Sequence, residues 1–185
     1  MISALIVNRR NSSKRQKEVN YRGFDGAYFF GEDYWEDFEL WLMDKDKCFE
    51  LNDNYLADLR YLDDLIEYVD SKNSLDIDLL LISDPSYINS HDKFTFIGYY
   101  YGEISGYNYA EDDKDELYFS IVINEVHNRP FKGFITKLNE YYLFSDIKDV
   151  MELDKVRDEN TLVEPAIEPE DCEIFKIHLY KKITS

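Results

Sequence analysis

One stretch with a helical apolar face constrains the fold of this chain more than any other sequence feature. Residues 54–70 carry apolar side chains at helical spacing and acidic side chains at the other positions. The apolar positions are Tyr55, Leu59, Leu62, Ile66 and Val69, and the outward positions are Asp58, Asp63, Asp64, Glu67 and Asp70. Such a segment is stable only when its apolar face packs on another element. We therefore expect a long amphipathic helix over a core, with Asp53 or Asn54 capping its first turn.

Three further segments are expected to be helical. Residues 32–44 repeat the pattern in an acidic stretch, with Tyr34, Trp35, Phe38, Trp41 and Leu42 at helical spacing. Pro130 favours a helix over about residues 130–140, because proline is well suited to a first helical position. Ser145 is a suitable N-cap for a helix over about 146–157, where acidic residues near the start interact favourably with the helix dipole.

Strand-like segments make up the rest of the predicted core. They are residues 2–8, 76–82, 94–101, 117–124 and 173–183. We expect 94–101 and 117–124 to pair antiparallel, because both are rich in strand-favouring residues. In the last segment, Phe175, Ile177 and Leu179 alternate with Lys176, His178 and Tyr180, which we expect to form its polar face. Together these patterns predict an α+β fold, with a mainly antiparallel β-sheet and three to four helices packed on one face.

The length and composition predict a single domain that spans residues 1–185. The chain has 185 residues, of which 44% are hydrophobic and 16% aromatic, so it can form a sizeable core and is not disordered as a whole. Residues 9–22 contain six basic residues and one acidic residue, and they are poor in apolar side chains, which predicts a basic mobile loop. Residues 158–171 contain Pro165 and Pro169 among acidic residues, which predicts a linker before the final strand.

The charge of the chain excludes several classes of partner. The formal net charge is −18 at pH 7, which disfavours binding to nucleic acid or to an anionic membrane surface. The basic loop at 9–22 folds back onto acidic groups in one interpretation and binds an anionic partner in another. We find no signal peptide and no apolar run long enough to span a bilayer. With only Cys48 and Cys172 available, a disulfide framework is not expected, and the sequence predicts a cytoplasmic protein.

Catalytic signatures are missing from the sequence. It contains no phosphate-binding glycine loop, no nucleophile elbow and no paired cysteine motif, so we expect a protein that is not an enzyme and has no cofactor. Glu125 and His127 are weak candidates for a metal site, since alternate residues of a strand point the same way. His178 could join them if its strand is a neighbour. A simpler interpretation is that His127 lies at a strand end and His178 faces solvent.

The best candidates for partner contacts are tyrosines beside an acidic loop. Exposed tyrosine is a favoured anchor at protein interfaces, and carboxylates around it would attract a basic protein. The predicted partner-binding residues are Tyr99, Tyr101, Tyr107, Tyr109, Glu111, Asp112, Asp113 and Asp115. The alternative is that these tyrosines are ordinary residues of a small sheet. In that case the acidic helices at 32–44 and 54–70 are the next candidate surface.

These observations favour a binding protein that neutralises a basic protein partner. In size and charge the chain resembles bacterial immunity proteins, which are small acidic domains that block toxins, often nucleases, by covering their positive clefts. The likeness implies a toxin or nuclease domain as the partner, and no motif carries it. One alternative is a DNA-mimic inhibitor of the anti-restriction or anti-CRISPR type, from a phage or mobile element, with Asp58, Asp63, Glu67 and Asp70 in place of phosphates. Another is a metal-dependent hydrolase that uses Glu125 and His127.

Overall fold

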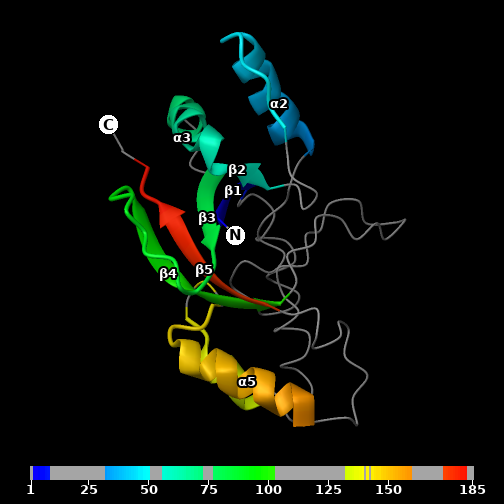
Figure 1. Ribbon diagram of the computed structural model, residues 1–185, viewed down its shortest axis with the longest axis vertical. Helices are drawn as coiled ribbons and strands as arrows, with labels where there is room; N and C mark the ends of the chain where they lie inside the picture. Colours follow the sequence, from blue (N-terminus) through cyan, green and yellow to red (C-terminus); the bar gives the residue numbers. More distant parts are fainter. Residues whose placement is uncertain are drawn as a thin grey trace, which may run out of the picture.

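The computed structural model describes residues 2–8, 32–50, 56–72, 77–102, 132–139, 141, 143–159 and 173–182. These residues form a mixed fold with one antiparallel sheet of five strands and three α-helices (Figure 1). The strands are β1 (Ile2–Asn8), β2 (Ala57–Asp58), β3 (Ile77–Ser83), β4 (Phe94–Gly102) and β5 (Glu173–Tyr180). The predicted combination of helices with an antiparallel sheet is therefore confirmed.

The order of the strands in the sheet is β2-β1-β3-β5-β4, and each neighbouring pair is antiparallel. Strand β3 is a central strand, and its Leu79, Leu80 and Leu81 are all fully buried, as expected for an apolar run covered on both faces. Strand β5 lies between β3 and β4. The expectation that its second set of residues faces solvent is wrong for His178 and Tyr180, because both faces of this interior strand are covered.

The connection from β3 to β4 crosses the strand between them. Both strands run antiparallel to β5, so they are parallel to each other, and residues 84–93 must carry the chain past β5. Lys176 of β5 donates a hydrogen bond from Nζ to the carbonyl oxygen of Tyr87 in this connection, at 2.9 Å. At its start, the Asp84 carboxylate accepts a hydrogen bond from the amide of Ser86, at 2.8 Å. The first hydrogen bond holds this connection against β5, and the second stabilises its first turn.

The predicted helix over residues 54–70 is shorter in the structure. Ala57 pairs with Ala4 of β1, so the chain is extended in β2 before it turns through the 3₁₀ helix η1 (Leu59–Tyr61) into α3 (Leu62–Ser71). Asp58 caps η1, where its carboxylate accepts a hydrogen bond from the amide of Arg60 at 2.9 Å. Pairing with a distant strand has overridden the local helical pattern. The predicted caps Asp53 and Asn54 lie outside the described residues.

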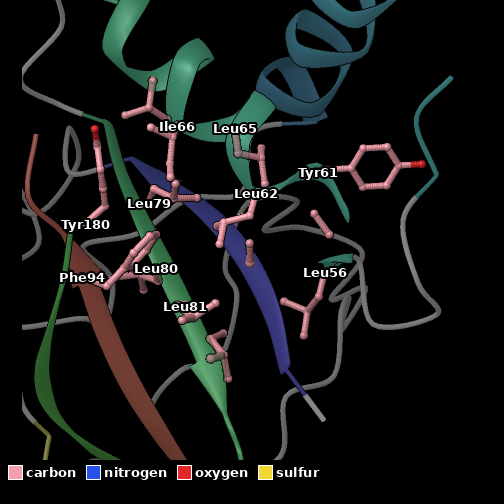
Figure 2. Packing of buried hydrophobic residues seen from close by; sticks show 14 of the residues in the cluster. Leu56, Tyr61, Leu62, Leu65, Ile66, Leu79, Leu80, Leu81, Phe94 and Tyr180 are labelled. Atoms are coloured by element: carbon pink, nitrogen blue, oxygen red, sulfur yellow. The ribbon is translucent and has the colours of Figure 1, made fainter. Parts of the chain in front are cut away.

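The main core lies between α3 and the sheet, with α2 (Glu32–Met43) packed on α3. Figure 2 shows Leu62, Leu65 and Ile66 of α3 directed toward Leu79 and Leu81 of β3. An aromatic group joins α2 to α3, because the Phe38 ring contacts the Tyr68 ring at a centroid distance of 5.2 Å. Phe38, Leu42, Leu62, Ile66 and Val69 of the predicted apolar faces are buried, but the expectation that Asp64 faces outward is wrong, because this residue is also buried. The predicted span of 32–44 agrees with α2 to within one residue.

A second, smaller core contains α5 (Ile147–Glu159) and the 3₁₀ helix η2 (Lys132–Lys137). Its buried members are Tyr101, Phe134, Phe144, Val150 and Leu153. Because α5 packs on this cluster and α2 and α3 on the other, the predicted packing of all helices as one layer is matched only in part (Figure 1). Where a helix was predicted over about residues 130–140, the described residues form only the shorter 3₁₀ helix η2. The first two residues of the predicted linker, Asp158 and Glu159, belong to α5, and residues 160–171 lie outside the described residues.

A bulge in β4 receives the turn that precedes α5. The register of β4 against β5 shifts between Phe96 and Gly98. Beside this shift, Tyr99 and Phe144 form a bridge, with hydrogen bonds of 2.8 and 2.9 Å between their backbones. The side-chain amide of Asn139 also donates to the carbonyl oxygen of Ile97, at 2.6 Å. These contacts attach the smaller core to the edge of the sheet.

Candidate partner-binding surface

Most of the residues predicted to contact a partner lie outside the described part of the chain. These are Tyr107, Tyr109, Glu111, Asp112, Asp113 and Asp115, and the same holds for the expected strand at 117–124, for the basic loop at 9–22 and for Glu125 and His127. The single-domain boundaries and the partner role of the hairpin therefore stay predictions. Only Tyr99 and Tyr101 of the predicted set have a described position.

Tyr101 is a core residue, so we remove it from the predicted partner surface. Its side chain is 1% exposed, and its hydroxyl donates a hydrogen bond to the carboxylate of Asp154 in α5. Tyr99 is half-buried, and its ring contacts the Phe96 ring at a centroid distance of 5.0 Å. Strand alternation turns Tyr100 to the other side, where it joins the main core. The run of three tyrosines thus serves largely to hold the two cores together.

Exposed carboxylates are concentrated on α2, α3 and the segments that flank them. We call this the acidic helix surface. It consists of Asp37, Glu39, Asp44, Asp46, Glu50, Asp58, Asp63, Glu67 and Asp70, all of which are exposed. This surface was the second candidate from the sequence, behind the hairpin. On both helices the acidic residues lie mainly on the side that faces solvent, because the opposite, apolar side is buried in the core.

The basic side chains of the same region are all used in contacts within the chain. Lys45 lies 2.6 Å from Glu67 and 3.7 Å from the centre of the Trp41 ring, and Lys72 lies 3.0 Å from Asp37. The hydrogen bond from Lys72 to Asp37 raises the pKa of the Lys72 ammonium group, which keeps it charged. Arg60 pairs with Glu50 at 3.3 Å, and Lys47 pairs with Asp64 at 2.6 Å. The described cations of residues 32–72 therefore neutralise acids of their own chain.

Four exposed carboxylates of the acidic helix surface have neither an ion-pair partner nor a side-chain hydrogen bond among the described residues. They are Glu39, Asp44, Asp46 and Asp63. Three of the four acids suggested for DNA imitation are instead bonded within the protein. Asp58 caps η1, Glu67 pairs with Lys45, and Asp70 accepts a hydrogen bond from the Tyr180 hydroxyl at 2.8 Å. A regular line of free carboxylates in place of phosphates is therefore not found along α3.

We expect the ion pair between Lys47 and Asp64 to respond unequally to the loss of each partner. Asp64 has a side chain that is 12% exposed, whereas that of Lys47 is 49% exposed. Lys47→Met leaves a mostly buried carboxylate without its cation and should reduce the free energy of unfolding by about 2 kcal/mol. Asp64→Asn leaves a lysine that water can solvate, so its cost should be about 1 kcal/mol. Urea unfolding monitored by circular dichroism measures both values.

The exposed pair between Arg60 and Glu50 is the control for this comparison. Both side chains are more than half exposed, so Glu50→Gln should change the free energy of unfolding by less than about 0.5 kcal/mol. If Lys47→Met and Asp64→Asn reduced the free energy of unfolding equally, burial of the Asp64 carboxylate would not explain the contribution of the Lys47–Asp64 pair to stability.

His178 is a buried histidine on the interior strand β5. It is 5% exposed, its ring centroid lies 5.7 Å from that of Phe96, and Nδ1 has no hydrogen-bond partner among the described residues. Burial, and then the charge of Lys176, lower the pKa of the His178 imidazole below its usual value. Within the described segments there is no group of three or more histidine, cysteine or acidic residues that could hold a metal ion.

The low pKa of His178 predicts an acid-sensitive fold. The unfolded chain binds a proton at His178 more readily than the folded chain, so this residue lowers stability as the pH falls below about 6.5. His178→Gln removes the titrating group. We expect the wild-type melting temperature to fall more steeply than that of His178→Gln between pH 7.5 and 5.5, by scanning calorimetry. Parallel curves for the two proteins would mean that His178 is protonated without cost in the fold.

Comparison of this chain with known proteins identified no relative. No protein-family model, no curated protein and no solved structure matches this chain. Among the helices that the structure describes, none has the length and apolar character needed to cross a membrane. The case for a function therefore depends on the chemistry of the described surface itself, and above all on its charge.

Proposed function

We propose that this protein is an acidic binding protein, without enzymatic activity, that neutralises a basic protein partner. An immunity protein that blocks a bacterial toxin, such as a nuclease domain, is the role that suits this chemistry best. The observation that carries the proposal is the charge imbalance of the acidic helix surface. Its nearby cations are paired within the chain, which leaves Glu39, Asp44, Asp46 and Asp63 available to an external cation.

The physical consequence of this imbalance is electrostatic steering. A surface of one charge sign attracts a partner of the opposite sign before contact, and it accelerates association more than it slows dissociation. The paired lysines also matter, because they tie α2 and the segment after it to α3. Lys45, Lys47 and Lys72 each join these two parts of the chain. The carboxylates would then be presented on a preorganised surface, which lowers the entropic cost of binding.

The proposal predicts that neutral substitutions slow association when they lie on the acidic helix surface. The test variant combines Glu39→Gln with Asp63→Asn. The control combines Glu173→Gln with Asp92→Asn, which removes the same charge from exposed positions elsewhere. Once a basic partner is purified by affinity capture, a biosensor should show that the test variant associates roughly threefold or more slowly at low salt. The control should associate nearly as fast as the wild type.

Two results would count against the proposal. One is an equal effect of the test and control variants, since steering by net charge alone requires no particular surface. The other is that the wild type retains no basic protein at all. The expected role also requires that the captured protein lose its own activity, for example its nuclease activity, when the acidic protein is added in equimolar amount.

A further inference from the structure

Helix α2 exposes an apolar pair on the side opposite to its core contacts. Leu40 and Met43 lie three residues apart, so they share one side of the helix, and their exposed fractions are 61% and 60%. Phe38 and Leu42 face the other way and are fully buried. Helix α2 therefore satisfies its packing with one side and still presents a leucine and a methionine to solvent with the other.

Carboxylates of the acidic helix surface flank this pair. Glu39 precedes Leu40, and Asp44 follows Met43, and both are exposed without an ion-pair partner among the described residues. The other large apolar side chains that are exposed in the described segments are Ile88, Phe96 and Met151. These three lie on three separate parts of the chain: the β3-to-β4 connection, β4 and α5. Among the described segments, two such side chains lie one turn apart only on α2, where exposed Glu39 and Asp44 are their neighbours in the chain.

We propose that Leu40 and Met43 form the apolar centre of the partner-binding surface, and that the partner is a basic protein which places an apolar side chain inside a ring of lysine or arginine residues. The inference rests on the proposed function and adds to it the position and chemistry of the contact. Binding energy in protein interfaces is concentrated in a few central side chains, while charged groups at the rim exclude water and set the rate of encounter. Leu40 and Met43 fit the first role, and Glu39 and Asp44 fit the second.

A second copy of this chain is a poorer occupant of the same surface. It would bring its own Glu39 and Asp44 against those of the first copy, and like charges across an interface are unfavourable. The net charge of −18 adds a general repulsion between copies. Nucleic acid is disfavoured by the same charge. A partner with an apolar side chain inside a basic rim complements both Leu40 and Met43 at the centre and the carboxylates at the edge.

The test uses two synthetic peptides with the same composition of leucine and lysine. One has all its leucines on one helical face, and the other is a scrambled sequence with no apolar face. We expect the wild type to bind the amphipathic peptide more tightly in about 0.15 M salt, by fluorescence anisotropy. Leu40→Ser combined with Met43→Ser should weaken that binding about tenfold and leave binding of the scrambled peptide unchanged. Met151→Ser, at a position on α5 that is 59% exposed, should change neither affinity.

The outcomes separate this inference from the proposed function. If the Leu40 and Met43 substitutions leave both affinities unchanged, or act no differently from Met151→Ser, the inference is wrong while the steering prediction still stands. If Glu39→Gln with Asp63→Asn leaves binding of both peptides unchanged, the proposed function fails as well. A wild-type dimer in sedimentation experiments that Leu40→Ser with Met43→Ser converts to monomer would assign the pair to self-association and overturn the inference. Equal melting temperatures for all variants verify that each is folded.

Discussion

Replacing Gly98 with alanine is expected to destabilise the protein by about 3 to 5 kcal/mol, a large fraction of the stability of a typical domain. Gly98 has a φ angle of +151°, a conformation that residues with a Cβ atom rarely adopt. A Cβ atom added here would lie 2.5 Å from Cβ of Leu143 and 3.0 Å from the carbonyl oxygen of Phe144. Both neighbours belong to the turn that is bonded to β4, so neither can move without breaking the bridge between Tyr99 and Phe144.

Urea unfolding of wild type and Gly98→Ala measures this effect, and Gly133→Ala is the matched control. A Cβ atom added at Gly133 has no neighbouring atom within 4 Å. The same chemical change should therefore shift the free energy of unfolding by no more than about 0.5 kcal/mol at Gly133, and it could stabilise the protein slightly. If the two variants were equally stable, the close approach of the turn to the β4 bulge would not be a feature of the folded protein in solution.

The glycine was visible in the sequence, but its role was not. Gly98 and Gly102 flank three tyrosines, which suggests a bend in a strand or a turn and does not indicate which segment approaches it. The approaching turn is about 45 residues away in the sequence, so no local pattern connects the two. Register shifts of this kind follow from tertiary contacts, and only the structure supplies them.

The bounds of five regular elements were predicted well. Strand β1 matches its predicted residues 2–8, and α2, β3, β4 and α5 begin and end within two residues of the predicted spans. The failures occur where distant segments decide the local conformation. Ala57 is extended and not helical because it pairs with β1. His178 is buried because β5 lies inside the sheet. The alternation of polar and apolar residues in β5 does not indicate that this strand lies between two others.

The candidate surface was only partly accessible to sequence reasoning. Most acidic residues on the outer faces of 32–44 and 54–70 follow from helical periodicity, although Asp64, which the pattern places outside, is buried. The pairing of Lys45, Lys47 and Lys72 with acids of the opposing segment does not, because each pair joins residues 17 to 35 positions apart. The exposure of Leu40 and Met43 was also not predicted, although both occupy positions on the acidic, outward side of α2. An apolar residue that departs from a helix's apolar face is the sequence signal that would have identified them.

Asn139 is expected to be as sensitive to substitution as Gly98, because its side chain closes the turn that packs there. Its amide nitrogen donates to the carbonyl oxygen of Ile97 at 2.6 Å. Its side-chain oxygen accepts hydrogen bonds from the amides of Tyr141 at 2.8 Å and of Leu143 at 3.2 Å. Asn139→Ala removes all three bonds in a partly buried site and should cost about 3 kcal/mol, measured by urea unfolding at pH 7.5.

Asn139→Asp tests the same geometry through its dependence on pH. The carboxylate retains an acceptor for Tyr141 and Leu143, but an oxygen replaces the donor that faced Ile97, so the variant should lose about 1 to 3 kcal/mol at pH 7.5. The amides of Tyr141 and Leu143 favour the ionised form, whereas partial burial and the carbonyl oxygen of Ile97, only 2.6 Å from the substituted atom, disfavour it. We expect the second effect to be the larger, so the carboxyl pKa in the folded variant should rise above its unfolded value. Protonation then restores a donor, and the stability gap to the wild type should narrow as the pH falls from 7.5 to 4.5, whereas the gap for Asn139→Ala should stay nearly constant. A gap for Asn139→Asp that is independent of pH would show that repulsion from the Ile97 carbonyl oxygen does not outweigh the two amide donors, and it would contradict this prediction.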